Sequence, residues 1–137
     1  MQILLKRAED NRDRLIVILA GYSNEMKELL KFNPGLTSRF SRTFEFPDYP
    51  ADDLIKIFHL MAEKSHYNFS DAVETKLMTV FENAIANKDE HFGNGRLVRN
   101  VFEKAIRNLA DRVVEITELT PEILTTILPG DIQVPNH

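Results

Sequence analysis

The stretch LIVILA, at residues 15–20, is apolar throughout and ends at Gly21. It shows no alternation of polar and apolar side chains, and its centre is β-branched. A run of this kind is typical of a strand that is covered on both faces in a parallel sheet. The first third of the chain is therefore predicted to belong to an α/β structure.

The residues around this run predict further short elements. Ser23 or Asn24 can cap a helix that continues to about Lys31. Pro47 would end a second short strand, because proline cannot donate to a sheet ladder. The expected elements are a helix end at residues 2–10, strands at 15–20 and 43–46, a helix at 23–31 and a helical turn at 36–40.

Helical periodicity dominates the chain after Pro50. Apolar residues recur at intervals of three and four, which gives each predicted helix one core-facing stripe. Ser70 is expected to cap one helix, and Thr120-Pro121 to begin the last one. The expected stripes comprise Leu54, Ile57, Phe58 and Met61; Val73, Leu77, Val80, Phe81, Ala84 and Ile85; Leu97, Val98, Val101, Phe102, Ala105, Ile106, Leu109 and Val113; and Ile123, Leu124 and Ile127.

The change of pattern places a domain boundary at residues 47–50. The predicted domains are residues 1–48, which carry both strands, a helical bundle at 49–129 and a flexible tail at 130–137. The predicted fold class is α-rich α/β, with two strands of a parallel sheet and a helix between them, followed by an all-α bundle.

Composition excludes several classes of function. The 137 residues contain no cysteine, which rules out disulfides, thiolate nucleophiles and zinc-thiolate sites. A net charge of -4 with mixed signs argues against a nucleic-acid surface. The longest apolar run is far shorter than the ~20 residues of a membrane helix, and a cytoplasmic protein without a membrane partner is expected.

The chain lacks the residue patterns of a metal site and of a P-loop. The four histidines lack metal-ligand spacing, and the acidic pair Glu9-Asp10 does not follow an apolar strand, where a magnesium-binding pair belongs. The chain contains no Gly-x-x-x-x-Gly-Lys-Ser/Thr loop, which P-loop enzymes use to cradle nucleotide phosphates. No metal site is predicted within these residues.

Two arginine motifs carry the strongest functional signal. The first is NPGLTSRF at residues 33–40, and the second is GNGRLVRN at residues 93–100. A planar guanidinium can hold two phosphate oxygens at once, which suits it to the charge that develops during phosphoryl transfer. The alternative for Arg39 is a surface arginine favoured by a helix C-terminus, and Arg42 is the second candidate in this motif.

These motifs, with RLIVILAGY at 14–22 and FPDY at 46–49, resemble the AAA+ ATPases grouped around stage V sporulation protein K and the red-type rubisco activases. The resemblance covers roughly residues 3–128. It implies the C-terminal half of an AAA+ module, comprising the fourth and fifth strands of the core sheet and the α-helical lid.

The resemblance implies a role for each arginine. Arg39 matches the arginine finger, which a subunit presents to its neighbour's nucleotide. Arg96 matches sensor 2, which reaches the nucleotide of its own subunit, and it follows the flexible entry at residues 93–95, namely Gly93, Asn94 and Gly95. A solvated arginine at a helix start is the alternative for Arg96. Arg99 could share this role or bind a carboxylate of the core.

Sensor 1 is less clearly marked. AAA+ proteins place a polar side chain there to orient the attacking water, and the matching junction here is Gly21-Tyr22-Ser23. Either Tyr22 or Ser23 could serve, and Ser23 could equally be only a helix cap.

The resemblance implies a parent protein that uses ATP and magnesium, assembles with identical subunits in a ring, expected to be a hexamer, and remodels an unidentified protein substrate. Without a P-loop, the chain alone is expected to be inactive and to bind neither cofactor tightly. Its residues 1–46 are expected to self-associate. The alternative is a non-catalytic helical adaptor that retains the lid's shape, and a phosphate-binding loop encoded upstream of Met1 would favour the ATPase.

Overall fold

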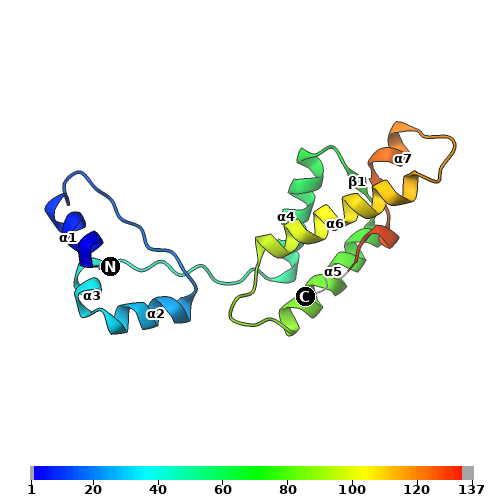
Figure 1. Ribbon diagram of the computed structural model, residues 1–137. Helices are drawn as coiled ribbons and strands as arrows, with labels where there is room; N and C mark the ends of the chain where they lie inside the picture. Colours follow the sequence, from blue (N-terminus) through cyan, green and yellow to red (C-terminus); the bar gives the residue numbers. More distant parts are fainter. Residues whose placement is uncertain (1, 134–137) are drawn as a thin grey trace. The chain divides into compact units, whose positions relative to one another are not determined.

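The computed structural model describes residues 2–133, without the side chains of Gln2, Leu4 and Leu5 (Figure 1). The chain divides into two compact units, an N-terminal unit at residues 1–46 and a C-terminal unit at residues 47–137. The division falls beside Pro47, where the sequence pattern changes from mixed to helical.

The N-terminal unit contains three helices, labelled in Figure 1 as α1 (Gln2–Asp10), α2 (Ser23–Phe32) and α3 (Pro34–Arg39). Asn33 separates α2 from α3, and its side chain donates to the carbonyl oxygen of Leu29 at 2.9 Å. Pro34 begins α3, where its missing N–H leaves no helical hydrogen bond unmade. Leu36 is fully buried within this unit.

The predicted strands at residues 15–20 and 43–46 are not formed. Ile16 is 88% exposed and Phe46 is 91% exposed, whereas Val17 and Leu19 are half-buried, so these segments are only partly covered in this unit. A strand satisfies its backbone only by pairing with neighbouring strands. The apolar pattern of residues 15–20 therefore indicates a segment suited to the interior of a sheet. The described residues of the N-terminal unit contain no sheet in which it could pair.

The predicted capping of α2 is also corrected. Ser23 is the first residue of the helix, and Tyr22 occupies the N-cap position with φ -67° and ψ 149°. No side-chain cap bond is formed at Tyr22, and Glu25 supplies a negative charge in the first turn.

Residues 47–133 of the C-terminal unit form a bundle of helices with one small sheet (Figure 1). Strand β1 (Asn68–Phe69) pairs in parallel with β2 (Thr126–Ile127), Asn68 opposite Thr126. The helices are α4 (Ala51–Lys64), α5 (Asp71–Ala86), α6 (Gly95–Val113) and α7 (Pro121–Thr125), followed by the 3-10 turn η1 (Pro129–Asp131).

Apolar faces of α4, α5 and α6 form the core of the bundle. Phe58 lies at its centre, with ring centroids 5.4 Å from both Phe69 and Phe102 in edge-to-face geometry. The predicted stripes are confirmed on all three helices. Fully buried residues include Leu54, Phe58, Val73, Leu77, Phe81, Val98 and Ala105.

The expected flexible tail at 130–137 is only partly described, and its first residues are packed. Asp131 is 2% exposed and Ile132 is 1% exposed, which corrects the expectation for this part. A network of hydrogen bonds from α6 holds η1 in place, since Asn108 Nδ2 donates to the carbonyl oxygen of Asp131 at 2.7 Å. Residues 134–137 lie outside the described residues.

The predicted helix-rich fold with a two-stranded parallel sheet is confirmed, but the described sheet lies in the C-terminal bundle and not in the N-terminal unit where it was expected. Within residues 2–133, no helix has the length and apolarity needed to cross a bilayer.

Candidate functional site

Arg39 is the last residue of α3, and two oxygen atoms of its own unit hold its guanidinium. Nη1 donates to the carbonyl oxygen of Gly35 at 3.0 Å, and Nη2 donates to Oε2 of Glu9 at 2.5 Å. A Cβ at Gly35 would lie 3.0 Å from Nη1, so glycine leaves room for this approach. The hydrogen bond from Arg39, and then its charge, lower the pKa of Glu9.

The Arg39–Glu9 ion pair is open to solvent. The side chain of Arg39 is 39% exposed and that of Glu9 is 59% exposed. Water and salt screen such a pair, so a phosphate could compete with Glu9 for the guanidinium. Arg42, the second candidate, is also exposed.

Arg96 is the second residue of α6, in the first turn as predicted. Its backbone N–H donates to the carbonyl oxygen of Gly93 at 2.8 Å, and its side chain is exposed. This turn contains no acidic residue that would neutralise the arginine. The dipole of a helix N-terminus adds to the positive potential at this turn, which favours an anion.

Arg99 is exposed one turn further along α6. It lines a shallow pocket between α4 and α6, together with Met61, Lys64, Ser65, Phe102 and Glu103. Arg96 does not line that pocket. The two arginines of this motif therefore have different surroundings.

Asn94 precedes α6, and its side chain makes contacts that the sequence does not predict. Oδ1 accepts from the backbone N–H of Tyr49 at 2.9 Å, and Nδ2 donates to Oδ1 of Asp48 at 2.7 Å. Asp48 also accepts from Nζ of Lys88 at 2.6 Å. The sequence analysis assigns no role to Asp48 or Lys88. The sequence feature that points to this site is the asparagine between two glycines at residues 93–95.

Tyr22 and Ser23 lie at the start of α2, and both are exposed. An exposed hydroxyl at a helix N-terminus is compatible with orienting a water molecule. The assignment of sensor 1 to either residue stays a prediction.

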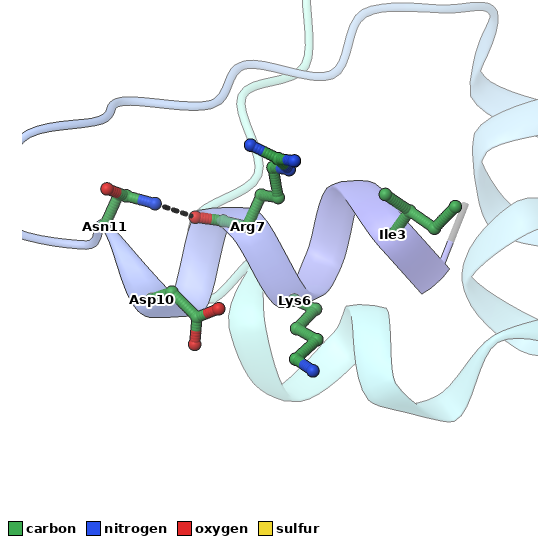
Figure 2. Close-up of a pocket in the computed structure, with 5 residues that line it drawn as sticks. All are labelled: Ile3, Lys6, Arg7, Asp10 and Asn11. Carbon is green, nitrogen blue, oxygen red and sulfur yellow. Dashed lines mark hydrogen bonds between the residues drawn. The ribbon is translucent and has the colours of Figure 1, made fainter.

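A second shallow pocket lies along α1 in the N-terminal unit (Figure 2). The figure shows Lys6, Arg7 and Asp10 from the helix and Asn11 just after it, whose Nδ2 donates to the carbonyl oxygen of Arg7 at 2.9 Å. Ile3 completes the lining. The residues come from a single helix and its end and carry charges of both signs, so we assign no chemistry to this pocket.

Curated relatives are similar over nearly the whole chain. Stage V sporulation protein K of Bacillus subtilis (strain 168) is 41% identical over 135 residues, which are 96% of this chain and 41% of that protein. Protein CbxX, chromosomal, of Cupriavidus necator is 38% identical over 96% of this chain and 42% of that protein. Protein CbbX of Cereibacter sphaeroides is 34% identical over 97% of this chain and 43% of that protein. The chain thus spans less than half the length of these relatives.

A family model described as the AAA lid domain matches residues 50–137. The match begins one residue before α4 and includes the whole described bundle. It agrees with the lid expected from the arginine motif of α6. The chain therefore belongs to the AAA lid domain family, and it is similar over nearly its whole length to Stage V sporulation protein K and CbbX.

Proposed function

We propose that this chain supplies the arginine finger and the lid of an ATP-driven AAA+ ATPase that remodels other proteins as a ring of identical subunits. One observation carries the proposal. Arg39 is the last residue of α3, and its guanidinium is held by the solvent-exposed carboxylate of Glu9. Such a group is positioned by its helix and is free to exchange Glu9 for a more highly charged phosphate.

In this proposal Arg39 acts on the nucleotide of the neighbouring subunit. Its guanidinium stabilises the negative charge on the γ-phosphate oxygens as the phosphoryl group is transferred. Arginine fingers contribute roughly 10³ to 10⁵ in rate, which corresponds to ~4–7 kcal/mol of barrier. The carbonyl oxygen of Gly35 orients the guanidinium before the phosphate arrives.

Arg96 acts on the nucleotide of its own subunit. Its place in the first turn of α6 combines a guanidinium with the positive end of the helix dipole, and both favour phosphate. Movement of the lid would then change the distance between Arg96 and the nucleotide. Arg99 is the alternative for this role, and Tyr22 or Ser23 is proposed to orient the attacking water.

The described residues fit only part of an ATP–magnesium site. Arg39 and Arg96 offer exposed cations for phosphate oxygens. The chain has no P-loop, and its Glu9-Asp10 pair ends α1 without following a strand, so magnesium would be held by residues beyond this chain. When bound, ATP would supply the phosphoryl group and the ion would neutralise its charge.

The test uses the complete gene product in mixed rings. Arg39→Ala should abolish hydrolysis and leave nucleotide binding nearly normal, because the residue acts on a neighbour's transition state. Mixing this variant with a subunit that cannot bind nucleotide should restore activity at interfaces where an intact Arg39 faces a bound nucleotide. Arg42→Ala tests the second candidate of the motif and should retain activity if Arg39 is the finger.

Two outcomes would contradict the proposal. Mixed rings that assemble normally yet recover no activity would exclude action in trans. A complete protein that binds no nucleotide would instead support the non-catalytic adaptor, in which the lid serves only as an interaction module.

A further inference from the structure

Asn94 has a backbone conformation that suits glycine better than asparagine. Its φ is 44° and its ψ is -113°, near the values at the first central position of a type II′ turn. Side chains rarely tolerate this region because of contacts with their Cβ. Glycine stands on both sides of the position, at Gly93 and Gly95, yet the strained residue itself carries a side chain.

The side chain of Asn94 explains why asparagine is useful there. Its amide uses both of its ends, accepting from the Tyr49 N–H and donating to Asp48. Nδ2 also lies 3.4 Å from the carbonyl oxygen of Phe92, within its own loop. Strained residues persist where the surrounding contacts determine their conformation, often at functional positions.

These contacts join three segments of the C-terminal unit. Asp48 and Tyr49 belong to the linker that leads into α4, Lys88 follows α5, and Asn94 directly precedes α6. Asp48 accepts from both other segments, with Oδ2 on Lys88 and Oδ1 on Asn94. Nζ of Lys88 also lies 5.8 Å from the centroid of the Phe92 ring, within range of a cation–π contact.

We infer that Asp48, Lys88 and Asn94 form a linker latch, which holds the first turn of α6 against the linker and thereby positions Arg96. The turn is short and continuous, since the N–H of Arg96 bonds to the carbonyl oxygen of Gly93 beside Asn94. A change in the direction of the linker is transmitted through the latch to this turn. The three are positioning residues, and the inference rests on the proposed contact of Arg96 with nucleotide.

The latch itself can be tested on the 137-residue chain without nucleotide. Asn94→Gly relieves the backbone strain, which stabilises the chain, and removes the side-chain hydrogen bonds, which destabilises it. Because the two effects oppose each other, the melting temperature should change little. Hydrogen exchange of the Tyr49 amide should accelerate roughly fivefold or more, the factor expected for one lost hydrogen bond. Asp53→Asn is the matched control, because Asp53 pairs with Lys56 on the surface of α4. Unchanged exchange at Tyr49 in Asn94→Gly would overturn the latch.

Positioning of Arg96 is tested by a charge exchange in the complete ATPase. Asp48→Asn weakens the bond to Lys88, and Asn94→Asp places two carboxylates together, so each single variant should raise the KM for ATP roughly fivefold or more. The double variant restores a donor facing a carboxylate and keeps the net charge. The double variant should therefore bring the KM for ATP most of the way back to the wild-type value. If each single variant only damaged the fold, combining them would not restore the KM.

The variant Arg96→Ala distinguishes failure of the latch from failure of the proposed contact between Arg96 and nucleotide. If Arg96→Ala weakens ATP binding and the exchanged pair shows neither loss nor rescue, the latch does not position Arg96. If Arg96→Ala has no effect on ATP binding while Asn94→Gly still frees the Tyr49 amide, the latch exists and the proposed role of Arg96 fails.

Discussion

Arg112 of α6 and Asp131 of η1 form a bidentate ion pair that links these two elements of the helical bundle. Nε and Nη2 of Arg112 donate to the two carboxylate oxygens of Asp131 at 3.1 and 3.0 Å. The side chain of Asp131 is 3% exposed, and Leu128 N–H donates to the same carboxylate at 2.8 Å. Nη2 of Arg112 also donates to the carbonyl oxygen of Thr126, the first residue of β2.

Loss of Arg112 should destabilise the bundle strongly. Arg112→Ala leaves the carboxylate of Asp131 buried without its cation, and breaking a buried pair in this way costs about 3–5 kcal/mol. Urea unfolding of the 137-residue chain measures the change. Arg107→Ala is the control, because its pair with Glu103 is exposed at 3.9 Å and contributes no more than about 0.5 kcal/mol. Equal effects for the two variants would contradict a stabilising role for this pair.

Phe58 should be the most sensitive core position on α4. Phe58→Ala removes a fully buried ring that packs on Phe69 and Phe102, and such truncations cost about 3–5 kcal/mol. Leu60→Ala on the same helix should cost less than about 0.5 kcal/mol, since Leu60 is 64% exposed. Thermal unfolding followed by circular dichroism compares the two, and a similar loss in both would be inconsistent with the described core.

The linker latch should respond to acid. The hydrogen bond from Lys88, then that from Asn94, lower the pKa of Asp48 from 3.8. A carboxylate with a lowered folded pKa contributes stability that is fully present above about 3.8 and is lost as the pH falls through the folded pKa. Carboxyl NMR titration should therefore find Asp48 titrating below 3.8 and moving back toward 3.8 in Lys88→Met. A midpoint unaffected by Lys88→Met would show that Lys88 does not hold this carboxylate.

The chain alone should hydrolyse no ATP above background, because it lacks the P-loop. A phosphate-release assay on the purified chain checks this. Arg96→Ala prepared in the same way controls for contaminating ATPases, which would be unaffected by the substitution. Turnover that is lost in Arg96→Ala would show a catalytic centre within these 137 residues.

The N-terminal unit should drive self-association of the isolated chain. Ile16 and Ile18 are 88% and 82% exposed in a segment suited to a covered strand. Light scattering should detect a dimer or larger species, and the double change Ile16→Lys with Ile18→Lys should reduce it. Leu60→Lys is the control, since it changes an exposed residue outside this segment. A wild-type chain that is strictly monomeric would contradict the prediction.

The sequence by itself determined the helices of the bundle and the positions of Arg39 and Arg96 at helix ends. The spacing of Val98, Val101 and Phe102 predicts the buried face of α6, because helical periodicity is a local property. Thr120 is equally local, and its hydroxyl accepts from Ile123 N–H at 3.2 Å, as expected for an N-cap. Arg39 and Arg96 lie at the helix ends where their motifs place them.

Only the tertiary structure decided which distant residues meet. Residues 15–20 have the composition of a strand but form none in this chain, because a strand depends on partners elsewhere in the sequence. Asp48 meets Asn94, and Arg112 meets Asp131, across long separations. Periodicity identifies the face on which a residue lies, whereas the polar partner of a charged side chain is chosen by the packing that brings the segments together.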